Sequence, residues 1–405
     1  MMKLIHTSDW HLGHRLYNYD RSDEETHFFD RLAQVVGVER PDALLVSGDI
    51  YHTGAPGNDV AKVFTERLLD VQAKCPDMEI VVIAGNHDSY SRLEIDRALW
   101  RRCRVHVLGT LAEDGSGRAD FARNVIEIPG KGLVAAVPFC HPRNFPVCGD
   151  GTESDRVSAY FSGLRQFVAE RNRAELPTVL MAHLAVGKET DLTGQDRKAI
   201  VGGEECVDSE TLGTGYDYIA LGHIHCPQWV KGGRKVARYC GTPRAIHFDE
   251  TYPHGVNVVT VEAGREAELR TVEFAPLRPL KTLGGKSGAP IGEVLKELGS
   301  ADLADGTYVR LNVSLAKGET VAVDWNERSR RIATDRNVRF CLINPIREDD
   351  GVASETAERR LTMQKLRELS DGEILSILDS ERELSDRQKE MLSELMAAMD
   401  DGANA

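Results

Sequence analysis

The 405-residue sequence lacks the features that mark membrane and secreted proteins. No run approaches the roughly 20 apolar residues that a membrane-spanning helix needs. The N-terminus goes from Met1 and Lys3 into Leu4-Ile5 and a polar turn, without the apolar region and small-residue cleavage site of a signal peptide. The eight cysteines are scattered, with no Cys-x-x-Cys pair and no disulfide-like spacing. We therefore expect a cytoplasmic protein with reduced thiols.

The sequence also lacks an excess of positive charge. Its net charge of -14 argues against a protein that coats nucleic acid by bulk electrostatics. The charge is uneven, because residues 347–405 carry sixteen acidic and eight basic residues, a net of -8, which leaves -6 for the first 346 residues. The body can therefore present a local basic groove. The cluster Arg97, Arg101, Arg102 and Arg104 is either a contact for a nucleic-acid backbone or an ordinary solvated helix face.

The length exceeds the usual single-domain size of roughly 100–200 residues, so we expect one large domain and something smaller. In the first 275 residues, short apolar runs alternate with segments of helical spacing. The helical segments are 23–38, 57–74, 91–102 and 154–171, and the apolar runs are 4–5, 43–46, 80–83, 133–137, 179–181 and 218–221. The runs are continuous, as in strands that are covered on both faces. The pattern predicts a layered α/β sheet, closed by antiparallel strands in 255–274.

A second, smaller unit follows a break in the pattern. Pro276, Pro279 and the run 284–288 indicate a linker, and the glycine-rich run lacks the full Walker spacing, so we prefer a flexible joint to a phosphate loop. The predicted elements after it are helices over 290–298 and 322–333 and strands over 307–315 and 338–343. They form a small α/β unit.

The acidic tail has helix signals of its own. Ser370 with Glu373, and Ser385 with Gln388, have the spacing of a capping box. Apolar stripes lie within 374–378 and 391–399, and neither has a sizeable core of its own to join. The stripes pack either on the body or on a protein partner, and we favour the partner.

Five short fragments place Asp, Asn or His directly after predicted strands. They are Asp9-Trp10-His11, Gly48-Asp49, Gly85-Asn86-His87-Asp88, Ala182-His183 and Gly222-His223-Ile224-His225. In α/β sheets, ligands gather at the carboxyl ends of strands, so we expect these side chains to converge. Together they make the ligand set of a two-metal phosphoesterase.

A phosphodiester is anionic, so its hydrolysis near neutral pH needs a generated hydroxide and neutralisation of charge. Two cations about 3.5–4 Å apart supply both, with a carboxylate bridging them. Asp49 suits the bridge, because Gly48 allows a sharp turn at the strand end. Asp9 and His11 can ligate one ion and Asn86 the other, while His183, His223 and His225 complete a mixed shell of nitrogen and oxygen. Imidazole ligands favour manganese, iron, zinc or cobalt over magnesium, and we expect manganese, with iron or zinc as alternatives.

The residues next to these ligands are candidates for catalysis. His87 follows Asn86, so it should project into the same cleft and contact the phosphate or protonate the leaving oxygen. We expect Asp88 to orient His87. His52, three residues after Asp49, is a second candidate for phosphate contact.

The fragments resemble the calcineurin-like metallophosphoesterase superfamily, and in detail its SbcD type of bacterial nuclease subunit. The resemblance covers nearly the whole chain. The segments that carry it are His6-Thr7-Ser8-Asp9-Trp10-His11-Leu12-Gly13, Gly48-Asp49-Ile50-Tyr51-His52-Thr53-Gly54, Ala84-Gly85-Asn86-His87-Asp88-Ser89 and Leu221-Gly222-His223-Ile224-His225. It implies a layered metallophosphoesterase β-sandwich flanked by helices over 1–277, a small α/β capping domain over 278–346 and a helical partner-binding tail over 347–405.

The resemblance also implies an activity and roles for residues. Asp9, His11, Asp49 and His225 would hold one manganese, Asp49, Asn86, His183 and His223 the second, and His87 would be the catalytic histidine. Relatives in one branch have Asp at the position of His52, and relatives in another have His there. The family cleaves DNA, from the 3′ end of duplexes and at hairpins. It does so together with the ATPase SbcC, which would bind the tail, and relatives commonly dimerise through the nuclease domain.

Two other functions compete with this hypothesis. The same chemistry could act on a small phosphodiester or a cyclic nucleotide, although the additional C-terminal residues and the Asp9-Trp10-His11-Leu12-Gly13 motif weigh against it. The chain could instead be a scaffold that kept the fold and lost its metals. Every ligand position is intact, which argues against a scaffold.

Overall fold

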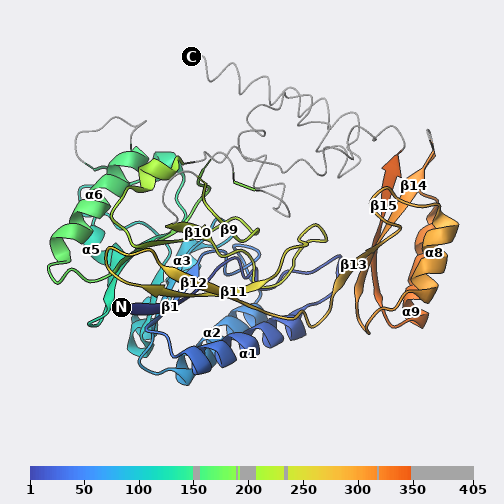
Figure 1. The fold of residues 1–405 in the computed structure, drawn as a ribbon, viewed down its shortest axis with the longest axis horizontal. Helices are drawn as coiled ribbons and strands as arrows, with labels where there is room; N and C mark the ends of the chain where they lie inside the picture. The colour runs from blue at the N-terminus through green and yellow to red at the C-terminus, as the bar shows by residue number, and fades with distance from the viewer. Residues whose placement is uncertain (149–155, 188–189, 192–206, 232–235, 317–318, 348–405) are drawn as a thin grey trace, which may run out of the picture.

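The computed structural model describes residues 1–148, 156–187, 190–191, 207–231, 236–316 and 319–347. This part of the chain forms a mixed α/β fold with two six-stranded sheets and one three-stranded sheet (Figure 1). None of its helices is long and apolar enough to cross a membrane. The helices predicted in the tail lie outside the described residues, which end at Arg347.

The first sheet contains the strands that precede Asp9, Asp49 and Asn86. Its strands are β1 (Met2–Thr7), β2 (Ala43–Ser47), β3 (Glu79–Ile83), β4 (Val105–Leu108), β11 (Gly255–Val261) and β12 (Glu268–Glu273). The order is β12-β11-β1-β2-β3-β4, in which β1 to β4 run parallel. The antiparallel pair predicted within 255–274 is confirmed as β11 and β12. The carboxyl ends of parallel strands lie at the same edge of a sheet, which brings Asp9, Asp49 and Asn86 to one edge of this sheet.

The second sheet contains the strands that lead to His183 and His223. Its strands are β5 (Val125–Ile128), β6 (Gly132–Val137), β7 (Thr178–His183), β8 (Tyr218–Gly222), β9 (Gln228–Trp229) and β10 (Ala237–Tyr239). The strand order is β5-β6-β7-β8-β10-β9, with β6, β7, β8 and β10 parallel and the two edge strands antiparallel. The ends of β7 and β8 are neighbours, so His183 and His223 emerge side by side.

The helices lie on the outer faces of the two sheets. They are α1 (Ser22–Glu39), α2 (Asn58–Lys74), α3 (Tyr90–Leu93), α4 (Arg97–Trp100), α5 (Phe121–Asn124) and α6 (Arg156–Arg171), with 3-10 turns η1 (Arg101–Cys103), η2 (Pro142–Asn144) and η4 (Ser209–Leu212). Figure 1 shows α1 and α2 below the strands of the first sheet, and α5 and α6 at the left of the view. The single helix predicted over 91–102 is wrong, because the chain there breaks into α3, α4 and η1.

The alternation of side chains along each strand explains the continuous apolar runs. In β1, Leu4 packs into the core between the two sheets, whereas Ile5 packs against α1 and α2. Leu180 of β7 faces α6, while Met181 faces the first sheet. Both faces of the central strands are therefore buried in both sheets, and the layered sandwich with flanking helices that the sequence predicts is confirmed.

The third sheet has a core of its own. Its elements are β13 (Leu280–Leu283), α8 (Ile291–Ser300), β14 (Tyr308–Leu315), α9 (Val323–Asp335) and β15 (Arg339–Arg347). The strands are parallel in the order β13-β14-β15, and their apolar side chains pack with those of both helices. We call 280–347 the cap. The predicted linker is partly wrong, because Leu280–Leu283 between its two parts pairs with β14.

Candidate active site

Sharp turns at the strand ends carry the predicted metal ligands. Asp9, His11, Asp49 and His223 have φ angles of 54°, 45°, 51° and 95°, in a region that side-chain-bearing residues rarely adopt. Such a backbone costs about 1–3 kcal/mol per residue and persists only where the surroundings enforce it. Four strained residues at four predicted ligand positions indicate a site that is built for function.

One group of ligand atoms gathers around His11. The Nε2 atoms of His11 and His225 lie 3.2 Å apart, and the Asp49 Oδ2 atom lies 3.7 Å from His11 Nε2. Ligand atoms of Asp9, His11 and His225 all lie within 4.8 Å of one another. All four side chains are buried. Two imidazole nitrogens that face each other beside carboxylates form an arrangement that suits a cation between them.

A second group gathers around Asn86. Its Oδ1 atom lies 3.0 Å from His183 Nε2 and 3.1 Å from His223 Nδ1. The Asp49 Oδ1 atom lies 3.5 Å from His183 Nε2, so the two oxygens of Asp49 face different histidines. The structure thus brings all seven predicted ligands together, in two groups that meet at Asp49. Asp9 also lies between the groups, because its carboxylate is within 4.8 Å of ligand atoms of Asp49 and His183.

One backbone carbonyl and close glycine contacts determine the orientation of His183. Its Nδ1–H donates to the carbonyl of Ser47 at 2.7 Å, so the neutral ring presents its Nε2 lone pair to the site. A Cβ atom on Gly48 would lie 2.2 Å from His183 Nδ1, and one on Gly222 would lie 1.9 Å from the Ser47 oxygen. Glycine at these two positions therefore allows the two sheets to approach each other.

The electrostatics of the site favour bound cations. Burial raises the pKa of the Asp9 and Asp49 carboxyl groups and lowers the pKa of His11 and His225. For Asp88, burial and then the nearby Asp49 charge raise the pKa to about 7. The carboxylates of Asp9 and Asp49 are close together and buried, so they need opposing charge to stay ionised, and a cation supplies it. The donor set and its burial therefore fit divalent metal ions.

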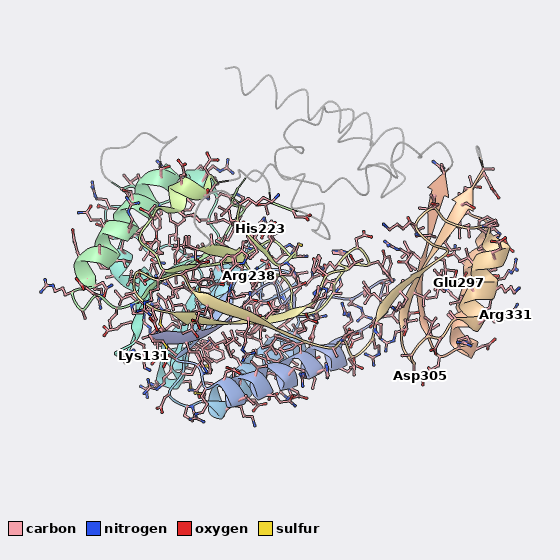
Figure 2. The ribbon with its side chains drawn as sticks, viewed as in Figure 1. Lys131, His223, Arg238, Glu297, Asp305 and Arg331 are labelled. Atoms are coloured by element: carbon pink, nitrogen blue, oxygen red, sulfur yellow. The ribbon has the colours of Figure 1, made fainter. Side chains whose placement is uncertain are left out.

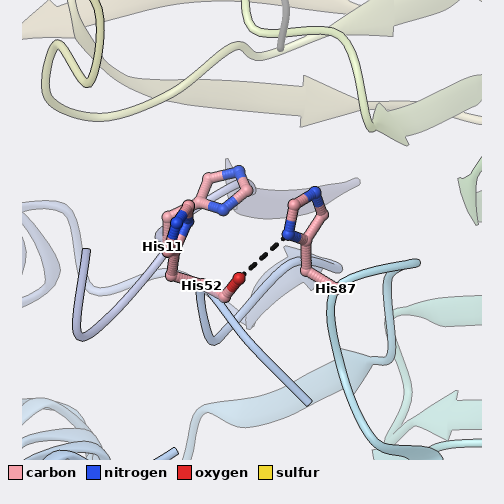
Figure 3. Close-up of side chains that lie close together, drawn as sticks. All are labelled: His11, His52 and His87. Carbon is pink, nitrogen blue, oxygen red and sulfur yellow. Dashed lines mark hydrogen bonds between the residues drawn. The ribbon is translucent and has the colours of Figure 1, made fainter. Parts of the chain in front are cut away.

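His87 lies at the rim of the site, beside His52 (Figure 3). Its Nδ1 atom is 3.0 Å from the His52 carbonyl oxygen, and its backbone N–H donates to Asp49 Oδ1 at 2.9 Å. The His87 ring contacts the His11 ring edge-on, with centroids 4.9 Å apart, and stacks on the His52 ring at 5.8 Å. The structure thus places both predicted catalytic histidines next to the ligand groups.

The contacts of Asp88 differ from those that we expected. Its carboxylate accepts backbone N–H groups from Ile50, Tyr51 and Gly85 at 2.8 to 3.0 Å. It therefore joins the loop after β2 to the loop after β3. The orienting contact for His87 is made by the His52 carbonyl, and we now assign Asp88 to holding the two ligand loops together.

The structure also reveals a residue that the sequence motifs did not indicate. Glu250 is buried, and its Oε1 atom lies 3.3 Å from Nδ1 of the predicted ligand His225. Its other oxygen accepts from the Thr242 hydroxyl at 3.0 Å. A carboxylate behind a metal-ligating histidine orients the ring. Glu250 follows no strand-end motif, so the sequence carried no signal for it.

The arginine cluster after the His87 loop is partly neutralised. Arg97 pairs with Glu94 at 3.6 Å and Arg104 with Glu79 at 2.6 Å, whereas Arg101 and Arg102 are exposed. These pairs favour the solvated-surface interpretation for Arg97 and Arg104.

Comparisons with known proteins agree with the geometry of the site. Residues 2–227 match the family model described as calcineurin-like phosphoesterase. The chain is 32% identical to the SbcD subunit of the nuclease SbcCD from Rhodobacter capsulatus over 75% of this chain and 77% of the relative. It is 32% identical to the Bacillus subtilis protein of the same name over 69% and 71%, and 26% identical to the Escherichia coli one over 97% and 96%. This chain therefore belongs to the calcineurin-like phosphoesterases and, within them, to the SbcD nucleases, hydrolases that act on phosphodiester bonds.

Proposed function

We propose that this chain is a manganese-dependent DNA nuclease that acts with an SbcC-like ATPase on duplex ends and hairpins. The observation that carries the proposal is the convergence of seven ligand side chains, six of them buried and Asn86 half-buried, with His87 at their rim. The relatives are named as subunits of the nuclease SbcCD, which supports a DNA substrate and an SbcC-type partner. The mixed imidazole and carboxylate donors support manganese, because magnesium prefers oxygen ligands.

The ligand side chains divide into two sets around Asp49. We assign Asp9, His11 and His225 to one ion, Asn86, His183 and His223 to the other, and Asp49 to both. When bound, two such ions would neutralise the phosphate and lower the pKa of the attacking water. The loops after β1, β2 and β3 and the ends of β7 and β8 hold these side chains in place before any substrate arrives.

His87 has the position of a general acid. Hydrolysis forms a bond from a water oxygen to phosphorus and breaks the bond to a sugar oxygen, which must take up a proton. The His87 Nδ1–H donates to the His52 carbonyl, so the proton would come from Nε2 of the doubly protonated ring, which becomes the neutral Nδ1–H imidazole when the sugar oxygen takes up that proton. We propose that the His52 side chain, stacked on the His87 ring, contacts the phosphate.

A direct test uses the purified full-length chain with manganese, a 3′-labelled duplex and a DNA hairpin, with and without its ATPase partner. We expect cleavage of both substrates, and gating by ATP when the partner is present. The variant Asp49→Asn serves as the inactive control. No DNA cleavage together with fast turnover of a small phosphodiester would instead support the small-substrate hypothesis.

Metal binding is expected to stabilise the fold. Because only the folded chain brings the ligands together, adding manganese at about 100 times its dissociation constant to EDTA-treated protein should raise the free energy of unfolding by about 2.7 kcal/mol per site. Thermal unfolding with manganese and with EDTA measures the shift. The shift should be lost in Asp49→Asn and kept in the exposed cap variant Asp305→Asn. Equal melting temperatures with and without metal would contradict the assignment.

We propose the domain boundaries 1–277, 278–346 and 347–405, the last being the partner-binding tail. The separate core of the cap supports the first boundary, and β15 extends through Arg347, so a deletion is best placed after it. Removing 348–405 is expected to abolish binding of the ATPase, because the tail carries the acidic excess and the apolar stripes, while basal hydrolysis persists. Co-purification and a nuclease assay measure the two effects. A complex that survives the deletion would refute the assignment.

We also propose that the nuclease domain forms a homodimer. Tyr90, Ile95 and Leu99 follow the His87 loop within ten residues of one another, and they are 60%, 80% and 64% exposed. Three large apolar side chains that are exposed within ten residues of one another support an interaction surface here. Light scattering should show a dimer that Ile95→Asp with Leu99→Asp converts to a monomer. The exposed cap residue Val323, changed to Asp, is the control, and an unchanged mass for the double variant would exclude this surface.

A further inference from the structure

We propose that residues 241–254, which we call the bridge segment, position His11 and His225 and are themselves held by the cap. The contact between the cap and the bridge segment would then determine how tightly His11 and His225 bind a cation. The inference rests on the proposed metal site, and it adds a regulatory contact between two parts of the chain.

The first contact of the bridge segment is with His225. Glu250 Oε1 lies 3.3 Å from His225 Nδ1, and Glu250 Oε2 accepts from the Thr242 hydroxyl and the Ile246 backbone N–H. The Thr242 backbone N–H donates to the His225 carbonyl at 3.1 Å. The ring and the backbone of His225 are thus both bound by the segment, which leaves Nε2 directed at Nε2 of His11.

The second contact is with the loop that carries His11. One guanidinium nitrogen of Arg244, Nη2, donates to the carbonyls of Trp10 and His11 at 3.3 and 3.2 Å and to Glu25 at 3.2 Å. Glu25 accepts in turn from the Gly13 backbone N–H at 2.7 Å. Arg244 therefore holds a loop whose positive φ angles require external support.

Stability alone does not explain Arg244. The side chain is buried, and its Nε and Nη1 atoms have no hydrogen-bond partner among the described residues. A buried cation with unmatched N–H groups costs free energy. A residue kept at such a cost next to two ligand-loop carbonyls is better explained by positioning of the loop.

The cap holds the middle of the bridge segment. Phe248 packs with Leu16 and with Tyr308 of β14, and the Arg310 guanidinium lies 5.2 Å from the Phe248 ring centroid. Arg310 also pairs with Asp249 at 2.8 Å. Asp249 contacts the cap, and the next residue, Glu250, contacts His225. The two contacts are made by adjacent residues, so a movement of the cap would shift Glu250 and with it the ring of His225.

A second chain of contacts runs parallel to the first. The Tyr308 hydroxyl donates to Glu24 at 2.6 Å, and Glu24 pairs with Arg21 at 2.5 Å. Arg21 donates to the carbonyl of Ala245, the residue after Arg244, at 2.8 Å. The cap therefore reaches the bridge segment from two directions, which restrains both Arg244 and Glu250.

The test measures manganese dissociation constants of the full-length chain by calorimetry and by electron paramagnetic resonance. The variants are Phe248→Ala and Arg310→Ala at the cap contact, Glu250→Ala at His225, and the double variant of Phe248 and Glu250. Arg331→Ala is the control, because Figure 2 shows Arg331 on the outer helix of the cap, away from the bridge segment. Arg310→Ala removes a pair whose partner Asp249 is 60% exposed, so this variant should fold even if Phe248→Ala does not.

We expect Glu250→Ala to weaken one of two manganese sites by about 10- to 100-fold, as other partners of metal-bound histidines do. Phe248→Ala and Arg310→Ala should weaken the same site, and Arg331→Ala should not. The double variant should be no weaker than Glu250→Ala alone, because both changes act through one contact. Wild-type affinity in both cap variants, or additive losses in the double variant, would overturn the inference.

A measurement without metal separates this inference from the proposed function. In metal-free protein, the amides of Leu12 and Thr242 should exchange hydrogen faster in Arg310→Ala than in Arg331→Ala. Wild-type protein that binds no pair of manganese ions would contradict the proposed function, but it would leave this comparison intact. Equal exchange in both variants would refute the proposal that the cap restrains the bridge segment.

Discussion

Replacing His87 by Gln is expected to lower the rate of DNA hydrolysis by about 10²- to 10⁴-fold, the usual contribution of a general acid or base. Gln retains a hydrogen-bonding group of similar length but cannot deliver a proton. His87 stands at the rim of the site, with its ring 4.9 Å from the ring of His11. Single-turnover cleavage of a labelled duplex measures the loss in the chemical step.

The same variant distinguishes catalysis from metal binding. We expect His87→Gln to bind two manganese ions with wild-type affinity, because the seven assigned ligands are untouched. His27→Gln, on the outer helix α1, is the matched control and should retain full activity. Loss of one metal ion would mean that His87 is itself a ligand, an outcome that is chemically reasonable because side-chain nitrogens of His11, His52 and His87 lie within 4.8 Å of one another.

Gly48→Ala is expected to reduce the free energy of unfolding by about 2–5 kcal/mol, combining a left-handed backbone and an overpacked contact. Gly48 has a φ angle of +93°, and an added Cβ would lie 2.2 Å from His183 Nδ1 and 3.0 Å from the Gly85 backbone. Neither neighbour can move without disturbing the site. The variant should therefore also lose the metal ion that His183 would hold, and urea unfolding with a manganese titration measures both effects.

Gly130→Ala is the matched control for Gly48→Ala. Gly130 also has a positive φ angle, +68°, but an added Cβ would meet nothing within 4 Å. Its loss should be limited to the backbone term of about 1–2 kcal/mol, with metal binding unchanged. Equal losses in the two variants would show that the approach of Gly48 to His183 is not tight.

The central strands of the two large sheets could be predicted from sequence because both of their faces are buried. Runs such as 43–46 and 80–83 are continuous in apolar residues, and a polar ligand follows each of them. Short edge strands such as β9, with two residues, offered no such run. The break between α3 and α4 was also missed, because the helical spacing of 91–102 continues through it.

Within the site, chemical type was predictable and pairing was not. Asp88 follows His87, which suggested a partner for that ring, yet its carboxylate accepts from Ile50 and Tyr51, 38 and 37 residues away in sequence. Glu250 reaches His225 across 25 residues without any motif. Such contacts depend on how loops fold over one another, which local patterns do not encode.

The sequence by itself determined the layered fold and the set of metal-ligand candidates, because a buried strand and a polar turn after it are both local patterns. The tertiary structure alone decided which side chains meet. It placed the ends of β1, β2 and β3 next to those of β7 and β8, and it put the His52 carbonyl at His87. It also placed Arg244 and Glu250 behind two ligands and next to the cap. These contacts follow from the packing of two sheets and a cap, whose distances and angles no single segment specifies.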